Sequence, residues 1–241
     1  MRHWLTPAHD ERFEAAASAM CALYLEAPAL AARGERVIST DELTGVQALE
    51  RLHPALPVAP GRVERREFEY VRHGTRAFIL DRDVVTGQVF APTCGPRRTK
   101  ADFVAHVGRT IATDPGAVRW HFAVDNLDIH RCESLVRLVA ELSRDESDLG
   151  VMGKSGVLKS RASRSAYLSD ASHKVVFHYT PVHASWLNQI EIWLSILVRK
   201  VLRRGSFTSV EDLKEKVLAF IEYYNRTMAR PFRWAYKPLK E

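Results

Sequence analysis

Three acidic residues, far apart in the chain, stand beside short apolar segments. Asp41 follows RVIST, Asp125 follows HFAV, and Glu191 lies among apolar residues in SWLNQIEIWLSILVRK. Carboxylate oxygens are the ligands that Mg²⁺ and Mn²⁺ prefer. If the three side chains meet at one edge of a sheet, they could hold two such ions. Two ions a few ångströms apart activate an attacking oxygen and stabilise a departing one in phosphoryl transfer.

Each of these acidic residues also has an ordinary structural explanation. An aspartate after a strand commonly belongs to a turn or a helix cap, and a glutamate on an apolar helix commonly lies at the edge of the buried face. Spacing alone does not show that the three converge. Other carboxylates nearby are assigned structural roles: Asp81 and Asp83 in a hairpin turn, Asp128 as a helix cap, and Glu42 on the strand face opposite to Asp41.

The elements that would position these side chains can be predicted from periodicity and turn residues. Short apolar strands are expected at 36–40, 118–125 and 174–179. Two or three antiparallel strands are expected over 67–92, with turns at HGT and DRDVVTG. Helices are expected at 9–32 with an interruption at Pro28, at 100–112, at 133–142, at 185–200, and from Thr208 or Ser209 to before Pro231. This order predicts an α/β fold with a mixed sheet flanked by helices, and sites in such sheets gather at carboxyl strand ends.

The helix that carries Glu191 should be buried, because apolar residues recur on it at steps of three and four. The last helix has an apolar face of its own and is expected to pack behind it. The aromatic residues of this region are expected to form core rather than a base-stacking surface: Trp186, Trp193, Tyr223, Tyr224, Phe232 and Trp234.

The motifs VISTDELTGVQALER, FAVDNLDIH, TPVHASWLNQIEIWLSIL and RRGSFTSVEDLKEKVLAFIEYYN resemble those of DDE transposases of bacterial insertion sequences, in the mariner-like superfamily. The resemblance runs from about Glu35 to Trp234. It implies an RNase H-like fold, in which antiparallel strands are followed by parallel ones. It also implies a catalytic triad of Asp41, Asp125 and Glu191 that binds two Mg²⁺ (or Mn²⁺) ions. The implied reactions are DNA cleavage by water and strand transfer by a DNA 3′-hydroxyl.

Two asparagines beside these carboxylates are candidates for orienting them. Asn126 directly follows Asp125, and Asn188 lies one turn before Glu191 on the same helix face, although either could instead cap a helix. The resemblance also suggests a division of the chain. Residues 1–34 are expected to form a helical linker segment and 35–241 the catalytic domain, with an inserted basic loop at about 143–172. Relatives carry an N-terminal helix-turn-helix region that recognises transposon ends, and the chain is expected to start just after it. A homodimer that brings two DNA ends together is also implied.

The formal net charge of +6 favours a polyanionic partner such as DNA. Basic residues fall into three groups: one after a predicted strand, one in the inserted segment, and one beyond the Glu191 helix. Phosphate binding and a solvated surface explain each group about equally well. With His183, which is expected to face the site, the candidate DNA-binding residues are Arg97, Arg98, Lys154, Lys159, Arg161, Arg164, Arg199, Lys200, Arg203 and Arg204.

Several other classes of site and location are disfavoured. Three isolated cysteines indicate a reducing compartment, which together with the resemblance predicts a nucleoid-associated protein of the bacterial cytoplasm. No apolar run is expected to span a membrane. His173, His178 and His183 lack the spacing of a zinc site. Two functional alternatives stay open: an RNase H-like nuclease without joining activity, and a non-catalytic or decayed DNA-binding remnant.

Overall fold

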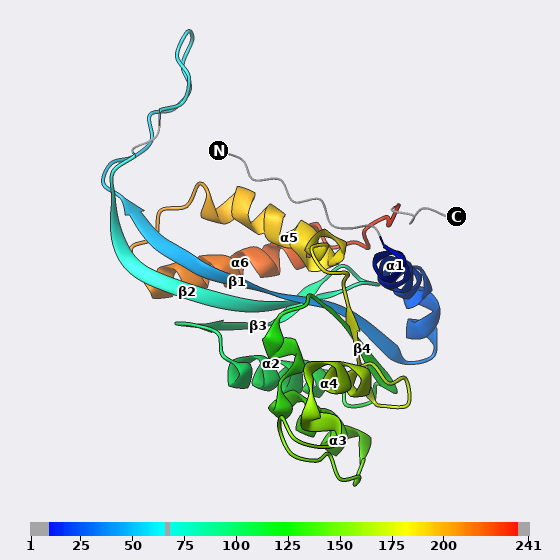
Figure 1. Cartoon of the computed structure of the whole chain (residues 1–241). Helices are drawn as coiled ribbons and strands as arrows, with labels where there is room; N and C mark the ends of the chain where they lie inside the picture. Colours follow the sequence, from blue (N-terminus) through cyan, green and yellow to red (C-terminus); the bar gives the residue numbers. More distant parts are fainter. Residues whose placement is uncertain (1–9, 66–67, 236–241) are drawn as a thin grey trace.

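A computed structural model describes residues 10–65 and 68–235, which form a mixed five-stranded sheet with helices on both faces (Figure 1). The strand order is β3-β2-β1-β4-β5. Antiparallel pairing joins β3, β2 and β1, and parallel pairing joins β1, β4 and β5. In chain order the main elements are α1 (Glu11–Ala32), β1 (Glu35–Arg51), β2 (Tyr70–Asp83), β3 (Val89–Gly95), α2 (Lys100–Ala112), β4 (Arg119–Val124), α3 (Glu133–Ser143), α4 (Arg161–Leu168), β5 (Val175–Tyr179), α5 (Gln189–Leu197) and α6 (Val210–Thr227).

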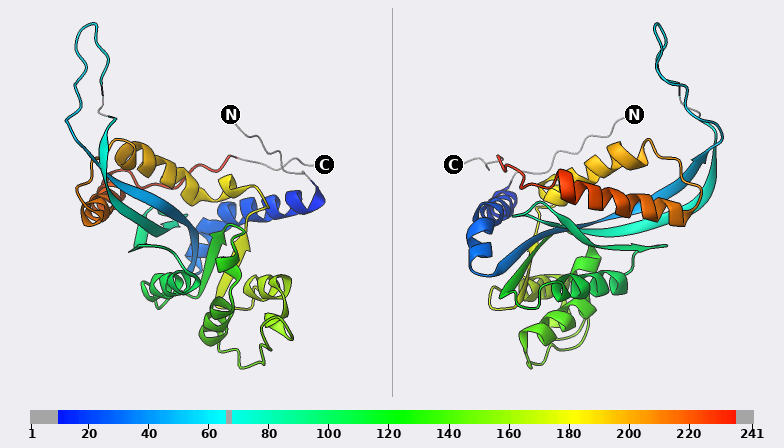
Figure 2. Two further views of the ribbon diagram at one scale, coloured as in Figure 1. Left: turned by 60° about the vertical axis from the view of Figure 1, so that its left-hand side comes forward. Right: turned by 180° about the vertical axis from the view of Figure 1, so that it is seen from behind.

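The sheet separates two layers of helices (Figures 1 and 2). Helices α2, α3 and α4 cover one face, and α1, α5 and α6 cover the other. Successive side chains of β1 point to opposite faces of the sheet, so the strand contributes to both layers. Ile38 packs with the α2–α3 layer, and Val37 packs with α1. The predicted mixed sheet and its order of elements are confirmed.

β1 is much longer than the predicted strand, and it does not end at Asp41. It continues to Arg51 and pairs with β2 into an extended hairpin arm, which projects from the body (Figure 1). The predicted turn at HGT is also wrong. His73–Thr75 lies inside β2 at an irregularity of the ladder, and Gly74 there has a φ of 110°, which suits glycine. A short strand and a turn were expected because Asp and Gly so often mark strand ends.

The turn between β2 and β3 is built on Asp83, as predicted. Its Oδ1 accepts hydrogen bonds from the backbone N–H groups of Val85 and Thr86, both at 2.8 Å. Gly87 has a φ of 76°, and a Cβ there would lie 2.1 Å from the carbonyl oxygen of Arg230. Asp81, however, is not a turn residue. It lies within β2, is fully buried, and accepts hydrogen bonds from the hydroxyls of Thr40 and Thr110.

Helix α1 runs through Pro28 without the predicted interruption, and the proline ring lies on its exposed side. Among the described residues, α1 is also the one helix long and apolar enough to cross a membrane by length and composition, contrary to the expectation for the sequence. Its buried face contains Phe13, Leu23 and Tyr24 and packs against β1 and β4. The division at residues 34/35 stays a prediction.

The segment 143–172 is not an irregular loop throughout. It contains α4, capped by Ser160, whose Oγ accepts from the Ser163 N–H. Leu158 and Leu168 are fully buried in the core of the α2–α3 layer. The Gly- and Ser-rich composition concealed these two apolar anchors.

The predicted helix at 185–200 is divided into three pieces. A 3₁₀ turn covers Ser185–Leu187, α5 follows from Gln189, and a π-helical turn covers Val198–Leu202. The predicted packing of α6 behind α5 is confirmed, with Trp193 and Tyr224 buried in a shared core. Trp186 and Tyr223 are 47% and 49% exposed and do not form core as predicted. Ser209 caps α6 through the Asp212 N–H.

Candidate active site

Asp41 and Asp125 lie level with each other at the point where β1 and β4 stop pairing. The last paired residues of this parallel ladder are Ser39 and Ala123, two residues before each aspartate. Beyond them β1 bends away with β2 as its partner, while β4 ends at Val124. The aspartates therefore occupy the carboxyl edge of the sheet where two strands separate, a usual position for a ligand site.

One oxygen of Asp125 is held by the protein and the other is free. Oδ1 accepts from the Leu127 N–H at 3.0 Å and lies 2.9 Å from Nδ1 of His130. Oδ2 has no hydrogen-bond partner within the described residues. Burial raises the pKa of Asp125, but the hydrogen bonds from His130 and Leu127 outweigh it and hold this pKa below its usual range. The carboxylate is therefore ionised and has one oxygen available to a cation.

Asp41 is buried next to the start of α5. Its Oδ1 accepts from the Glu42 N–H at 2.7 Å, and Nδ2 of Asn188 lies 3.5 Å from Oδ2. Burial is the main cause that raises the pKa of Asp41, and the negative charges of Asp125, Glu42 and Glu191 raise it further. These carboxylates are thus close enough to repel one another, which a divalent cation would relieve.

Glu191 reaches this region from the first turn of α5. It is half-buried and lines an open pocket of about 510 Å³ together with Glu42 and Arg199. Asn188, just before α5, fixes this helix to β1 by accepting from the Ser39 hydroxyl and donating to the Thr40 carbonyl at 2.8 Å. Within the described ranges, no three Asp, Glu, His or Cys side chains are close enough together to hold a metal ion as they stand.

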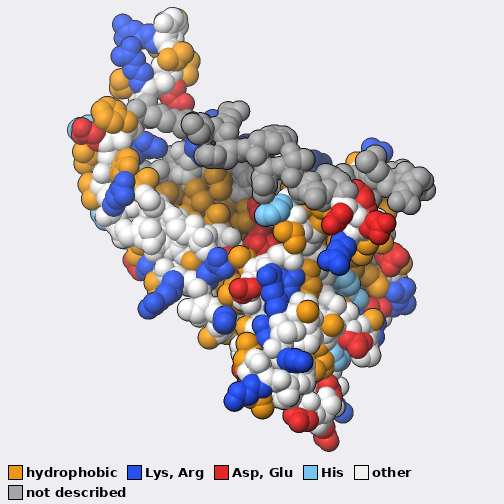
Figure 3. Space-filling model, viewed as in Figure 1, with side chains coloured by type: hydrophobic (Ala, Val, Ile, Leu, Met, Phe, Trp, Pro, Cys, Tyr) orange, Lys and Arg blue, Asp and Glu red, His pale blue; other side chains and the backbone are white. Residues whose placement is uncertain are grey.

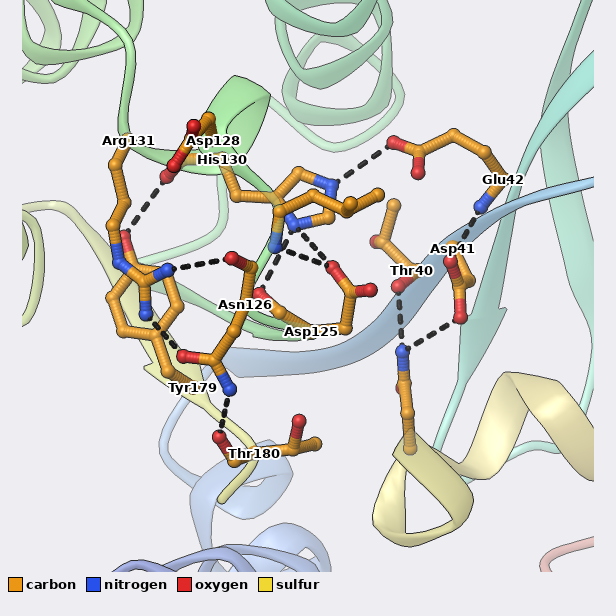
Figure 4. Close-up of polar contacts among 12 residues, drawn as sticks. Thr40, Asp41, Glu42, Asp125, Asn126, Asp128, His130, Arg131, Tyr179 and Thr180 are labelled. Atoms are coloured by element: carbon orange, nitrogen blue, oxygen red, sulfur yellow. Dashed lines mark hydrogen bonds and ion pairs between the residues drawn. The ribbon is translucent and has the colours of Figure 1, made fainter. Parts of the chain in front are cut away.

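Glu42 and His130 are site residues for which the sequence assigned no such role (Figure 4). His130 is fully buried and lies between Asp125 and Glu42, with Nε2 2.9 Å from Oε1 of Glu42. Burial alone lowers the pKa of His130, but the two carboxylates outweigh it and raise this pKa to about 9. The signal in the sequence was the spacing of five residues between Asp125 and His130 in DNLDIH.

Asn126 joins the ends of β4 and β5 and does not contact the carboxylate of Asp125. Its Nδ2 donates to the Thr180 carbonyl, and its Oδ1 accepts from Arg131 at 2.6 Å. Arg131, which the sequence analysis did not single out, also lies 3.8 Å above the ring of Tyr179 (Figure 4).

Some of the predicted DNA-binding residues border the site. Arg98 lies 3.6 Å from Glu42, Arg161 donates to the Asn126 carbonyl at 2.6 Å, and Arg164 donates to the Arg131 carbonyl at 2.6 Å. His183 lines a pocket of about 500 Å³ with Asn126. In Figure 3 a small group of acidic side chains lies in a hollow of this face, and several Lys and Arg side chains lie below it.

Within the described part of the chain, the remaining basic candidates form no ion pair with Asp41, Asp125 or Glu191. Arg199 lines the pocket of Glu191, whereas Lys200 and Arg204 line a neighbouring pocket with Met228. The others are exposed at the surface: Arg97, Lys154, Lys159 and Arg203. The three histidines at steps of five are separate, since His173 packs on Tyr167 and His178 packs on His121.

Comparison with known proteins identifies the family and the fold of the chain. The model of the DDE superfamily endonuclease family matches residues 36–214. The Mos1 mariner paired-end complex with Mn is similar with a TM-score of 0.56 and 14% identity, covering 94% of this chain and 61% of that chain. For the catalytic domain of Mos1 mariner transposase the TM-score is 0.53 at 12% identity, over 92% and 90% of the two chains. These similarities confirm the RNase H-like fold. The chain spans about 61% of the Mos1 protein in the paired-end complex. A search of curated proteins finds no match.

Proposed function

Because the chain belongs to the DDE superfamily endonucleases, we propose that it is the catalytic domain of a DNA transposase, which cleaves DNA and joins transposon ends to target DNA. One observation carries this proposal: Asp41 and Asp125 lie level on neighbouring strands, beside the start of the helix that carries Glu191. The transposon would be a bacterial insertion sequence, as the motifs imply, and the protein would work on the nucleoid in the cytoplasm.

Asp41, Asp125 and Glu191 would hold two Mg²⁺ or Mn²⁺ ions. The donor set fits such ions, because it consists of hard carboxylate oxygens, one of which, Oδ2 of Asp125, has no partner in the described part of the chain. Burial and, to a lesser extent, repulsion by the neighbouring carboxylates raise the pKa of Asp41, and a cation would relieve this repulsion. When bound, the ions would supply Lewis acidity to phosphoryl transfer. Because no three such side chains in the described ranges are close enough to hold an ion as they stand, coordination would require the carboxylates to move closer together.

The surrounding residues would position the carboxylates and the DNA. Asn188 fixes the start of α5 against β1, so that Glu191 is carried on a helix whose other face is packed in the core. Arg98, Arg161 and Arg199 border the site and would bind phosphates of the DNA backbone. Such contacts add affinity that falls with salt and carries no base specificity.

The DNA-bound form would be a homodimer that holds two transposon ends. Support comes from the hairpin arm, which projects from the body and exposes several large apolar side chains: Leu52, Leu56, Val58, Val63, Phe68, Tyr70 and Val71. The Mos1 transposase in a paired-end complex with the left transposon end has the same fold. Sedimentation velocity of the chain with and without end DNA would measure the mass of the complex.

The test is a strand-transfer assay with a pre-cut DNA end and a target plasmid, in Mg²⁺ or Mn²⁺. Joined product is expected. Metal-dependent cleavage without joining would indicate a nuclease instead. A chain that neither cleaves nor joins, even when fused to an end-binding domain, would be a non-catalytic remnant, and the proposal would be rejected.

A further inference from the structure

His130 lies where β1 and β4 separate, and each of its ring nitrogens faces a carboxylate. Nδ1 lies 2.9 Å from Oδ1 of Asp125 and 3.1 Å from the backbone carbonyl oxygen of the same residue, and Nε2 lies 2.9 Å from Oε1 of Glu42. A carboxylate oxygen accepts hydrogen bonds, so both nitrogens act as donors. The ring is fully buried and packs on Phe103 with centroids 4.5 Å apart, while its backbone carbonyl accepts from the Tyr179 hydroxyl at 2.9 Å. Its position is therefore fixed on several sides.

Glu42 is not an ordinary surface acid. Its side chain is 1% exposed, and besides His130 it has Arg98 at 3.6 Å. Its backbone N–H donates to Oδ1 of Asp41 at 2.7 Å, so the same residue contacts both aspartates, one directly and the other through His130. Because Ser39 and Ala123 are the last paired residues of β1 and β4, no ladder hydrogen bond within the described residues joins the strands at the level of the aspartates.

We propose that Glu42 and His130 form a positioning pair that sets the spacing of Asp41 and Asp125 and thereby the affinity of the site for divalent cations. The inference rests on the proposed function. At the level of the aspartates, where β1 and β4 share no ladder hydrogen bonds, the buried contacts from Glu42 through His130 to Asp125 connect the two strands. The pair also occupies Oδ1 of Asp125, so that Oδ2 is the oxygen presented to a cation. Neither residue is proposed to contact the DNA or the reacting atoms. Side chains that orient metal ligands in this way typically change metal affinity or activity about 10–100-fold when they are removed.

The test uses three variants. Two are substitutions at the site that keep its shape, and the third is a matched control. His130→Asn retains an amide near the position of Nδ1 but loses the contact with Glu42. Glu42→Gln retains an acceptor for His130 but removes the charge. The control is His121→Asn, which alters another buried histidine, 2.8 Å from Glu35 at the opposite end of β4. Binding of Mn²⁺ to each purified chain without DNA is measured by electron paramagnetic resonance, and cleavage is measured against Mg²⁺ concentration.

Both site variants are expected to bind Mn²⁺ about 10–100-fold more weakly than the wild type. The Mg²⁺ concentration for half-maximal cleavage should rise by a similar factor, and saturating Mg²⁺ should restore much of the rate. A merely structural role would lower the unfolding temperature without moving either metal readout, which is the result expected for His121→Asn. If His130→Asn does not fold, Glu42→Gln decides the question.

Unchanged Mn²⁺ affinity in a folded His130→Asn or Glu42→Gln chain would overturn the positioning role and leave the proposed function intact. A wild-type chain that binds no Mn²⁺ and does not cleave would overturn the proposed function, and the positioning role with it. The wild type and the variants therefore separate the two failures.

Discussion

At the scale of single residues, the candidate site is organised by which carboxylate oxygens the protein holds. Oδ1 of Asp125 accepts from the Leu127 N–H and lies 2.9 Å from Nδ1 of His130, and Oδ1 of Asp41 accepts from the Glu42 N–H. Oδ1 of each aspartate is thus held by the fold, while Oδ2 of Asp41 has a longer contact of 3.5 Å with Asn188. Fixing one oxygen limits rotation of the carboxyl group, so the other oxygen is already oriented before a ligand arrives.

Replacing Asp125 by Asn should abolish metal-dependent cleavage while preserving the fold. The amide removes a negative charge from the cation site but keeps an oxygen that can accept from His130 and Leu127. We expect the rate of cleavage to fall by more than about 100-fold. This exceeds the usual effect of removing a residue that only orients a metal ligand. Salt-dependent DNA binding and the unfolding temperature should stay near wild type. The measurements are plasmid nicking in Mg²⁺, a DNA-binding titration and thermal unfolding.

Asp128→Asn is the matched control, since Asp128 lies in the same motif. Its side chain is 79% exposed and pairs with Arg161 at 3.4 Å, away from the free oxygen of Asp125. Cleavage by this variant should remain close to wild type. Retained cleavage in Asp125→Asn would instead mean that another group performs the reaction.

A second residue-scale prediction concerns pH and the pair formed by buried His121 and half-buried His178, whose ring nitrogens lie 3.0 Å apart. Burial, and to a lesser extent His121, lowers the pKa of His178 to about 4. A histidine in the unfolded chain titrates near 6.5, about the usual value. Between these values the unfolded state binds more protons, so the free energy of unfolding falls as pH drops from about 6.5 toward 4.

His178→Gln should remove this contribution. Relative to the variant, the wild type is expected to lose up to about 1.4 kcal/mol of unfolding free energy per pH unit in that range. Urea denaturation of both chains at pH 7 and pH 5 measures the difference. Equal losses in the two chains would show that His178 is not the group responsible.

The sequence predicted some of the residues of the candidate site but not all of them. The motifs singled out Asp41, Asp125 and Glu191, but neither Glu42 nor His130 was assigned a role in the site. Glu42 follows Asp41 directly, and strand alternation correctly separated their faces. The sequence pattern did not predict the 3₁₀ turn at Asp128–Arg131. This turn places His130 between the ends of β1 and β4. That contact spans 88 residues of sequence and depends on tertiary packing.

At the scale of elements, the position of Glu191 depends on α1 as well as on α5. The Tyr24 hydroxyl donates to the Leu187 carbonyl at 3.0 Å and accepts from the Gln189 N–H at 3.4 Å. These two backbone groups flank the non-helical residue Asn188, at the boundary between the 3₁₀ turn and α5. The sequence predicted one unbroken helix here because its apolar stripe continues across the break.

Tyr24→Phe should therefore destabilise the chain and disturb the site. Removing the hydroxyl leaves buried backbone groups without a partner, which costs about 1–3 kcal/mol of unfolding free energy. We also expect weaker Mn²⁺ binding, because the start of α5 loses a support. Tyr223→Phe, at a residue that is 49% exposed, is the control and should change stability by less than about 0.5 kcal/mol. Equal effects of the two variants in urea denaturation would contradict this role for Tyr24.

Element order was predictable in a way that element length was not. The short apolar segments at the starts of β1 and β4 are strands because they are buried on both faces. The outer half of β1 is different: it has no β4 neighbour and continues only because β2 pairs with it as far as Tyr70. The sequence of β1 does not show that β2 will pair with its outer half. The sequence analysis therefore predicted separate short strands and turns in place of the arm.

At the scale of the whole molecule, the two helical layers put basic side chains on both sides of the carboxylate edge. Arg98 comes from the α2 side and Arg199 from the α5 side. The carboxylates themselves repel phosphate, so DNA is expected to be held mainly by these flanking charges until cations bind. The net charge of +6 adds an overall attraction to DNA, so the affinity is expected to depend strongly on salt.

Arg199→Gln tests this distribution of charge. If Arg199 contacts one phosphate, the slope of log affinity against log salt concentration should become shallower by about 1. Arg137→Gln is the matched control, because Arg137 is 57% exposed but pairs with Glu133 on α3, in the other layer. It should leave the slope unchanged. Fluorescence anisotropy with a labelled duplex over a range of salt concentrations gives both slopes. A similar change in the two variants would mean that binding reflects net charge alone, and that DNA has no preferred path past Glu191.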